Sequence, residues 1–359
     1  MKPLRVAVIG GDGIGPEVVE QACRVLGAAE RAGLVEVELE EFPHGADHFL
    51  ATGETLSDAT FGRLRDEFDA ILFGAVGDRR VPDGRHARDL LLGLRFRLDL
   101  YINRRPLRLR AADLSPLKRA APGSIDFVIY RENTEGLYVG RGRIEHEGTA
   151  DEVAISEGVA SRRAVERIVE AAFDAARTRG SRVTLSDKAN AVPHMYGLWR
   201  RVFSEVAGRH ADVESEMRYV DALAMELVRA PERFGVIVTS NLLGDILSDL
   251  GAELIGGPGL APSANVHPGR HGLYEPVHGS APDLAGTGRA NPMAAVLSVA
   301  LLLADAGAVD AAAALERAVD DALAEGVRTP DLGGDATTTE VGDWLCARIA
   351  HPGSRAPPG

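Results

Sequence analysis

Short apolar runs alternate along the chain with longer amphipathic runs. The short runs are rich in β-branched residues and read VAVIG, VEVELEEF, AILFGAV, DFVIYRE, RVTLSD and GVIVTSN. Between them stand segments such as EVVEQACRVLGAAERAG and RAVERIVEAAFDAARTRG, whose apolar residues recur at helical spacing. Strand-like and helix-like segments in alternation predict an α/β fold.

Two further segments carry distinctive local signals. A helix is predicted directly after Ser161, because serine is a preferred N-cap, and it should end at the Arg-Gly pair of residues 179–180. Residues 256–292 are rich in glycine and proline, which predicts one long loop. Loops of that length are uncommon inside compact chains and usually serve a function.

A glycine-rich turn follows the first predicted strand, in the segment VAVIGGDGIGPEVVEQACRVL of residues 6–26. Such a turn before a helix can hold a pyrophosphate on backbone N–H groups, with an acidic ribose ligand downstream. Four acidic residues could serve there: Glu36, Glu38, Glu40 and Glu41. However, Gly11, Gly13 and Gly15 follow G-x-G-x-G rather than G-x-G-x-x-G, and Asp12 would repel phosphate. We therefore favour a tight strand-to-helix turn.

Length and charge limit the possible functions. The 359 residues favour two domains, and the net charge of -13 disfavours binding to nucleic acid or an anionic membrane. An anionic substrate would therefore need a local arginine cluster. The two cysteines, Cys23 and Cys346, indicate neither a disulfide framework nor a zinc site, and no segment suits a membrane span. A soluble cytoplasmic protein is the simplest prediction.

Two aspartates lie four positions apart in VIVTSNLLGDILSDLGAEL, where an apolar strand is predicted to run into a helix. Asp245 and Asp249 then share one helix face and repel each other. Either this face is solvated, or the two carboxylates share a hard divalent cation such as Mg²⁺ or Mn²⁺. Asp221, after the strand-like MRYV, is a possible third ligand or an ordinary loop residue.

Arginines gather in the segment GLRFRLDLYINRRP of residues 93–106, within an otherwise acidic protein. Arginine binds carboxylates in a bidentate manner, so Arg95 and Arg105 are candidate substrate ligands, and Arg131 could join them. Others are expected to be surface charges: Arg97, Arg104, Arg108 and Arg110. Lys188 follows a predicted strand, where a desolvated ammonium group can act as a base, although a solvated lysine is the default.

The chain as a whole resembles the metal-dependent β-decarboxylating 2-hydroxyacid dehydrogenases, the family of isopropylmalate, isocitrate, homoisocitrate and tartrate dehydrogenases. The motifs that carry the resemblance occur in the family's order: GDGIGPEV, LRFRLDLYINRRP, RENTEGLY, DKAN, NLLGDILSDL, EPVHGSAPDLAG and TPDLGGDATT. The resemblance implies a two-domain isopropylmalate-dehydrogenase-like fold that binds its dinucleotide without a Rossmann fingerprint.

By this resemblance the motif EPVHGSAPDLAGTGRANP holds the adenosine end of the cofactor. Asp283 would accept hydrogen bonds from a ribose 2′-OH and repel a 2′-phosphate. The family's NADP users show lysine and tyrosine at the positions of Asp283 and Leu284, so NAD is predicted. The further expected cofactor contacts are Glu275, His278, Gly279, Ser280, Ala281, Asn291 and Asn190.

The resemblance also assigns chemical roles. Arg95, Arg105 and Arg131 resemble the clamp for the malate carboxylate, and Asp221, Asp245 and Asp249 resemble the ligands of Mg²⁺ or Mn²⁺. Tyr138 and Lys188 look like the acid–base pair, with Asp221 beside them in the catalytic set. In this family Lys188 and Asp221 reach the site from the neighbouring subunit, which implies a homodimer, with a tetramer also open.

The substrate is expected to be a 3-substituted malate, a small hydroxy diacid. Leu91 and Leu92 precede Arg95 by one helical turn and would form an apolar wall, as in isopropylmalate dehydrogenases. The best prediction is therefore 3-isopropylmalate, converted to 2-oxoisocaproate in leucine biosynthesis. Homoisocitrate, isocitrate, tartrate and malate stay open, and Arg88 or His86 could meet an anionic substituent unless both lie on a solvated face. An inactive regulatory subunit of the same fold is the non-enzyme alternative.

The two expected domains interleave along the chain. Residues 1–100 and 257–359 should form the first domain, with the NAD-binding loop. Residues 101–256 should form the second, with the dimer interface and the metal ligands. By resemblance, the middle of RENTEGLYVGRGRIEHEGTADEVAISEG forms an arm that clasps the partner subunit.

Overall fold

All six strand-like runs form strands, and the long amphipathic runs form helices. The computed structural model describes residues 3–351, which divide into two compact units. Of these residues, unit 1 comprises 3–100, 109–123 and 252–351, and unit 2 comprises 101–108 and 124–251. The chain thus returns to unit 1 at Ala252, compared with the expected return near Gly257, and Leu109–Gly123 also belongs to unit 1.

Unit 1 is built on five strands in the order β2-β1-β3-β12-β11. The strands are β1 (Leu4–Gly11), β2 (Val37–Glu41), β3 (Ala70–Ala75), β11 (Pro262–His267) and β12 (His271–Pro276). Neighbours from β2 to β12 pair in parallel, and only β11 and β12 pair antiparallel. Parallel strands need helical crossovers, which the intervening helices provide.

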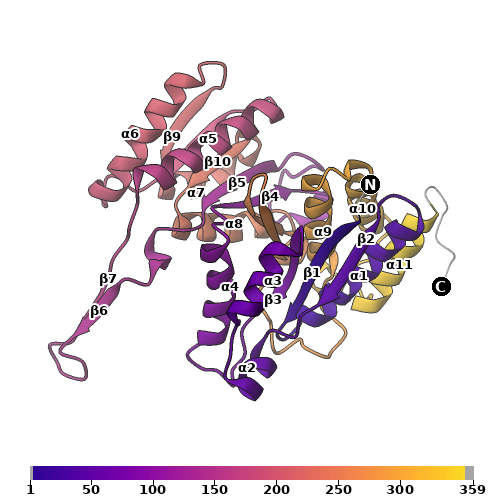
Figure 1. Cartoon of the computed structure of the whole chain (residues 1–359). Coiled ribbons are helices and arrows are strands. Elements are labelled where there is room, and N and C mark those ends of the chain that lie inside the picture. The colour runs from indigo at the N-terminus through magenta and orange to yellow at the C-terminus, as the bar shows by residue number, and fades with distance from the viewer. Residues whose placement is uncertain (1–2, 352–359) are drawn as a thin grey trace. The chain divides into compact units, whose positions relative to one another are not determined.

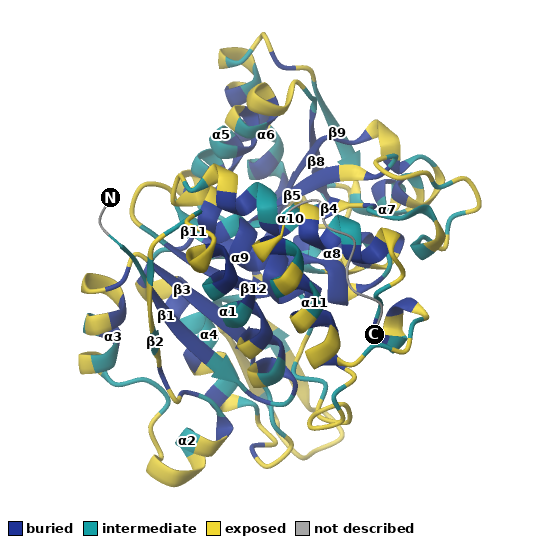
Figure 2. Ribbon diagram, turned by 90° about the vertical axis from the view of Figure 1, so that its right-hand side faces the viewer, coloured by how far each residue is buried: buried dark blue, intermediate teal, exposed yellow. Residues whose placement is uncertain are grey.

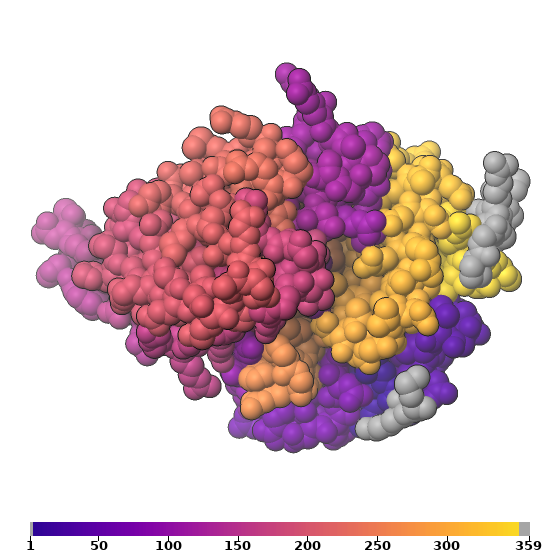
Figure 3. All heavy atoms as spheres, turned by 90° about the horizontal axis from the view of Figure 1, so that it is seen from above, coloured from indigo at the N-terminus to yellow at the C-terminus, as the bar shows by residue number. Residues whose placement is uncertain are grey.

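Helices cover both faces of this sheet (Figure 1). They are α1 (Gly15–Arg31), α2 (Ala46–Thr52), α3 (Asp58–Asp66), α4 (Arg85–Arg97), α9 (Met293–Asp305), α10 (Val309–Ala324) and α11 (Thr338–Ala350). The core on one face joins side chains of β1 and β3, such as Ile9 and Phe73, to Leu90 and Leu94 of α4. Figure 2 shows β1 and β3 buried, and Figure 3 shows the C-terminal helices, orange to yellow, at the surface.

Unit 2 is built on the strand order β4-β5-β10-β8-β9. Its strands are β4 (Ile102–Arg108), β5 (Asp126–Glu132), β8 (Val183–Asp187), β9 (Ser215–Tyr219) and β10 (Val236–Thr239). Only β4 and β5 pair antiparallel. The helices are α5 (Arg162–Arg179), α6 (Pro193–Arg209), α7 (Val220–Arg229) and α8 (Asn241–Leu254), whose last residues fall in unit 1.

The predicted ends of α5 are confirmed. The Ser161 side chain accepts a hydrogen bond from the Ala164 backbone N–H at 3.2 Å, and Gly180 closes the helix in the left-handed conformation. The region expected to be the arm contains an antiparallel hairpin of β6 (Gly142–Glu145) and β7 (Val153–Ser156), which extends away from α5 and α6 (Figure 1). Its role in clasping a partner stays a prediction.

The prediction of one long loop over residues 256–292 is wrong. The segment contains β11 and β12, joined by a short turn, so the longest irregular stretch is residues 277–292. Glycine and proline mark the ends of these strands, and Pro262 and Pro276 stand at terminal strand positions. Proline is tolerated there because it interrupts no interior ladder. No helix of the described residues is long and apolar enough to cross a membrane.

Candidate active site

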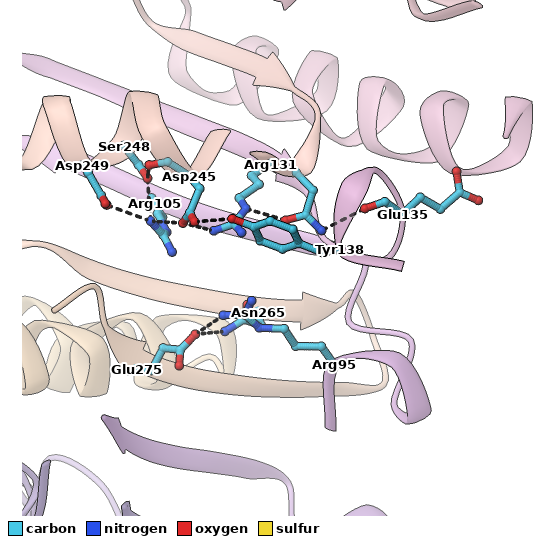
Figure 4. Close-up of polar contacts among 11 residues, drawn as sticks. Arg95, Arg105, Arg131, Glu135, Tyr138, Asp245, Ser248, Asp249, Asn265 and Glu275 are labelled. Carbon is cyan, nitrogen blue, oxygen red and sulfur yellow. Dashed lines mark hydrogen bonds and ion pairs between the residues drawn. The ribbon is translucent and has the colours of Figure 1, made fainter. Parts of the chain in front are cut away.

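Two buried arginines lie side by side in unit 2, on adjacent strands. Arg105 of β4 is 5% exposed and Arg131 of β5 is 1% exposed. Both donate hydrogen bonds to α8, which begins two residues after β10. Arg105 Nη1 donates to Ser248 Oγ at 2.6 Å, and Arg131 Nε donates to Asn241 Oδ1 at 2.9 Å (Figure 4).

The two aspartates of α8 face these guanidinium groups. Asp245 Oδ1 lies 2.5 Å from Arg131 Nη1 and 3.4 Å from Arg105 Nη1, and Asp249 Oδ1 lies 3.4 Å from the same Arg105 atom. The expectation that Asp245 and Asp249 share one helix face is confirmed. Arg105 and Arg131 reduce the repulsion between the two carboxylates.

The contact between α8 and Arg131 depends on glycine at position 244, which has no side chain. A methyl group added at Gly244 would lie 2.7 Å from Arg131 Cγ and 2.8 Å from Arg131 Cβ. Because real Cβ atoms do not approach that closely, α8 can lie against β5 only with glycine at this position. Gly244 therefore sets the distance between Arg131 and Asp245.

Tyr138 reaches the same cluster from the short 3-10 turn Leu137–Val139. Its hydroxyl donates to Asp245 Oδ2 at 2.8 Å, and the Arg131 guanidinium lies over its ring. Burial and the Asp245 carboxylate raise the pKa of Tyr138, and Arg131 and Arg105 oppose this shift. The phenol is therefore held protonated, as a proton donor must be.

The pKa of Asp249 is also raised, first by partial desolvation of its largely exposed carboxylate and then by Asp245, against the pull of Arg105 and Arg131. Two oxygen-bearing groups that disfavour each other's charge suit a hard divalent cation, which would relieve the repulsion. Within residues 3–351, however, no cluster of three or more histidine, cysteine, aspartate or glutamate side chains could hold a metal ion. The expected third ligand, Asp221, lies elsewhere in unit 2.

Asp221 and Lys188 form a second pair. Lys188 directly follows β8, as predicted, and its Nζ lies 2.7 Å from Asp221 Oδ1. Asp221 stands in the first turn of α7 rather than in a loop, and the Lys188 ammonium lowers its pKa. The buried Asp187 shapes this turn by accepting from the Ala189 backbone N–H at 2.7 Å and from Arg200 Nε at 2.8 Å.

Arg95 belongs to unit 1, where its Nη2 lies 2.7 Å from Glu275 Oε1 (Figure 4). Asn265 Nδ2 donates to the same oxygen at 2.8 Å. Glu275, expected to touch the cofactor, therefore holds Arg95 in this structure. Arg97 is a surface charge, as predicted, but the same prediction for Arg110 is wrong, because its side chain is 7% exposed and bound to Asp320 at 2.5 Å.

Helix α4 carries the residues expected to meet the substrate's substituent. Leu91 packs partly on the core, and Leu92 is half-buried. Arg88 is exposed and pairs with Asp89, so its side chain lies on a solvated face. His86 does not lie there: it is 1% exposed, and its Nε2 lies 2.9 Å from Asp12 Oδ2.

The irregular segment after β12 holds most of the expected cofactor residues. His278 has a buried Nε2 without a hydrogen-bond partner, and burial lowers its pKa. Asp283 is exposed and lies 3.2 Å from Arg79, and the Asn291 amide is bound to Asp331 and to the Met293 backbone. The remaining residues are placed as follows: Gly279, Leu284 and Asn190 are exposed, Ala281 has φ +38°, and Ser280 O accepts from the Ile14 backbone N–H.

The glycine-rich turn of residues 10–15 is not free to hold a pyrophosphate. Three of its N–H groups are used within the protein: Asp12 N donates to Ala75 O, Ile14 N to Ser280 O and Gly15 N to Asp12 O. Gly11 and Gly13 have positive φ, and a Cβ at either would overlap a neighbouring carbonyl oxygen. The favoured interpretation as a tight structural turn is therefore confirmed.

Two buried arginines that face a carboxylate-bearing helix are typical of an α/β enzyme with a small anionic substrate. The family model for isocitrate/isopropylmalate dehydrogenase matches residues 5–345. The chain belongs to this family of decarboxylating dehydrogenases, and its fold is that of the family.

Individual relatives match over nearly their whole length. The 3-isopropylmalate dehydrogenase of Thermobifida fusca is 46% identical over 356 residues, which cover 98% of this chain and 99% of the relative. That of Mycobacterium tuberculosis H37Rv is 47% identical over 336 residues, covering 92% and 98%. The isocitrate dehydrogenase of Methylococcus capsulatus superposes with a TM-score of 0.88 at 37% identity, covering 97% of this chain and all of that structure. A β-decarboxylating dehydrogenase of Thermococcus kodakarensis gives 0.78 at 40% identity, covering 96% of each chain.

Proposed function

We propose that the protein oxidises and decarboxylates 3-isopropylmalate to 2-oxoisocaproate with NAD⁺ and Mg²⁺ or Mn²⁺, in leucine biosynthesis. This proposal rests mainly on one cluster of side chains. In it, Arg105 and Arg131 face Asp245, and Tyr138 donates a hydrogen bond to the same carboxylate. Such a cluster can bind a dicarboxylate and deliver a proton beside it. The relatives named 3-isopropylmalate dehydrogenase support this substrate.

The residues of the chain fit the two cofactors. Asp245 and Asp249 present oxygen ligands of the kind that Mg²⁺ and Mn²⁺ prefer, and the repulsion between them favours a cation. The buried and unpartnered Nε2 of His278 suits an adenine contact, and the exposed Asp283 carboxylate suits a ribose diol. Asp283 would repel a 2′-phosphate, which favours NAD over NADP.

Each step of the reaction has a residue to perform it. The bound cation and NAD⁺ supply polarisation of the substrate's oxygens and an acceptor for the hydride from C2. Arg95, Arg105 and Arg131 hold the carboxylates, and Lys188 takes the proton of the C2 hydroxyl. The carboxylate on C3 then leaves as CO₂. Tyr138, whose pKa is raised by burial and by Asp245, gives its proton to C3 of the resulting enol.

We further propose a homodimer in which Lys188 of the partner subunit and Asp221 of the partner subunit complete each site. Helices α7 and α8 carry large apolar side chains that lie open: Met225 is 62% exposed, Val228 is 46% and Ile246 is 57%. Exposed apolar side chains beside the candidate metal ligands suit burial against a second copy of the chain. The two cysteines are free thiols, which suits a cytoplasmic enzyme.

The proposed function is tested by NADH formation with 3-isopropylmalate, isocitrate, homoisocitrate, tartrate and malate, each with and without Mn²⁺. We expect the highest kcat/KM with 3-isopropylmalate, a requirement for the metal, and a preference for NAD⁺ over NADP⁺. A higher kcat/KM with another diacid would contradict the assignment of 3-isopropylmalate as the substrate. Failure with every substrate would instead favour the regulatory-subunit alternative.

The variant Leu92→Ser gives a matched test of specificity. It removes an apolar side chain from α4 without touching Arg95, so kcat/KM for 3-isopropylmalate should fall about tenfold. The value for malate, which lacks the alkyl group, should change little. An equal loss with both substrates would contradict a role for Leu92 in recognising the substituent.

A further inference from the structure

One buried amide lies between Arg131 and the turn that carries Tyr138. Asn241 is the first residue of α8 and is 1% exposed. Its Oδ1 accepts from Arg131 Nε at 2.9 Å, and its Nδ2 donates to the Glu135 backbone carbonyl at 3.0 Å (Figure 4). Asparagine at the start of a helix commonly caps the backbone of that helix. Here both ends of the amide bond to residues outside α8.

The backbone just before Tyr138 packs directly on Asn241. Gly136 has φ +88°, and a methyl group added there would lie only 3.2 Å from Asn241 Cβ. On its other side, the Glu135 carboxylate accepts from the Ser161 backbone N–H at 2.6 Å and from its hydroxyl at 2.7 Å. The short turn that carries Tyr138 is therefore supported by Asn241 from one side and by the start of α5 from the other.

Asp245 holds the same two groups, but its carboxylate has a second task. Its Oδ1 lies 2.5 Å from Arg131 Nη1, and its Oδ2 accepts from the Tyr138 hydroxyl at 2.8 Å. The proposed function requires Asp245 to bind a divalent cation through these oxygens. The cation then competes with the guanidinium and the phenol for the carboxylate, since all three seek its negative charge.

We propose that Asn241 is a positioning residue, which keeps Arg131 and Tyr138 in place while Asp245 turns to the cation. A neutral amide suits this role because it presents an acceptor to a guanidinium and a donor to a carbonyl, which an ionised carboxylate cannot do. The inference rests on the proposed function, in which Asp245 is a cation ligand and Tyr138 delivers the proton to C3.

Two substitutions separate the two ends of the amide. Asn241→Asp keeps an acceptor for Arg131 but places a carboxylate oxygen against the Glu135 carbonyl, whereas Asn241→Ala removes both contacts. In single turnovers with 3-isopropylmalate and Mg²⁺, Asn241→Asp should slow proton incorporation at C3 about tenfold more than it slows reduction of NAD⁺. Asn241→Ala should show the same imbalance and also raise KM about tenfold, because Arg131 loses a contact that orients it.

Ser240→Ala is the matched control. Ser240 immediately precedes α8 and is 5% exposed, and its hydroxyl lies 3.0 Å from the Tyr196 hydroxyl. The substitution removes a buried hydrogen bond at the same end of the helix, but one directed to α6 rather than to Arg131 or Tyr138. The ratio of the two rates should therefore equal that of the wild type, even where thermal stability falls as far as in Asn241→Ala.

A measurement without turnover separates this inference from the proposed function. In protein labelled with fluorotyrosine, the fluorine resonance of Tyr138 is assigned by its loss in Tyr138→Phe and recorded with and without Mg²⁺. With Mg²⁺ it should stay sharp in the wild type and in Ser240→Ala. In Asn241→Ala it should broaden or move toward the position of a solvent-exposed tyrosine.

Three results would overturn the inference: a wild-type ratio of the two rates in both Asn241 variants, an equal change of that ratio in Ser240→Ala, or a Tyr138 resonance with Mg²⁺ that is the same in Asn241→Ala as in the wild type. If the wild-type protein turns over no diacid, the proposed function fails instead. The fluorine spectra then decide by themselves whether Asn241 holds Tyr138.

Discussion

The Tyr138 hydroxyl donates to Asp245 Oδ2 at 2.8 Å, while the other oxygen of that carboxylate is bound by Arg131. One carboxylate thus orients both the candidate proton donor and a candidate substrate ligand. It also helps to raise the pKa of the phenol. Tyr138→Phe removes the donated proton but keeps the ring next to Arg131. We expect kcat to fall by about 100-fold, with little change in thermal stability.

The partial reactions locate this defect. If Tyr138 protonates the carbon after CO₂ leaves, Tyr138→Phe should slow solvent-proton incorporation at C3 more than reduction of NAD⁺ in a single turnover. Equal slowing of both steps would argue for a positioning role through Asp245 instead.

Gly244 permits the approach of α8 to Arg131. Gly244→Ala should displace that side chain, cost about 1–3 kcal/mol of unfolding free energy from overpacking, and raise KM for the diacid. The matched control is Gly208→Ala in α6, where an added Cβ meets nothing within 4 Å. That control should be neutral or stabilising by up to about 1 kcal/mol. Comparable losses in both variants, measured by chemical denaturation, would count against the contact with Arg131.

Shared sites predict complementation between two inactive variants. Lys188→Ala and Asp245→Asn each remove a different half of a site. A dimer with one chain of each type should therefore contain one intact site and show about half of the wild-type activity. The measurement is activity of the tagged and purified mixed dimer. If each site were built from one chain, both sites would be defective and the mixed dimer would be inactive.

The raised pKa of Asp249 links metal binding to stability. In the folded chain the carboxylate holds its proton more tightly than in the unfolded chain. Its stabilising contribution is therefore present at acidic pH and is lost as the pH rises through the folded pKa. Asp249→Asn should slightly raise the unfolding temperature of the metal-free protein at neutral pH. The same substitution should also abolish the increase in unfolding temperature that Mn²⁺ causes in the wild-type protein.

The effect in the metal-free protein should be small because the Asp249 side chain is 67% exposed. Asp245→Asn is the contrasting variant: it breaks the ion pair with Arg131 and should lower the unfolding temperature in the absence of metal. A lower unfolding temperature in both variants would contradict the raised pKa of Asp249.

The thiol of Cys23 is expected to be unreactive. Its pKa of about 12 leaves roughly a thousandfold less thiolate at about pH 8 than a free cysteine has. In a Cys346→Ser background, labelling of the native protein by a disulfide reagent should be correspondingly slow and should become fast on unfolding. Fast labelling of the native protein would contradict the raised pKa of this thiol.

Local patterns were enough to predict six of the strands, the ends of α5, and the shared face of Asp245 and Asp249, because these depend on side-chain periodicity and capping along one segment. They also excluded a phosphate-binding turn near Gly11. Asn241 and Ser248 were missed, although they continue the polar stripe of Asp245 and Asp249 at helical spacing on an otherwise apolar helix. That period was the signal that could have identified both.

Other predictions failed because they required knowledge of distant partners. Arg110 is buried because Asp320, far along the chain, neutralises it, and His86 is buried with its Nε2 atom 2.9 Å from Asp12 Oδ2. The composition of residues 256–292 gave no sign that two antiparallel strands could pair there, since glycine and proline also mark strand ends.

The amino-acid sequence by itself therefore determined the α/β alternation of its six strand-like runs with helices, the kinds of chemical groups available, and the motifs shared with the family. The tertiary structure decided which charge meets which: Asp245 with Arg131 and Tyr138, Lys188 with Asp221, and Arg95 with Glu275. The reason is physical. Periodicity is a property of neighbours along the chain, whereas the energy of a charge depends on burial and on partners that folding alone brings within a few ångströms.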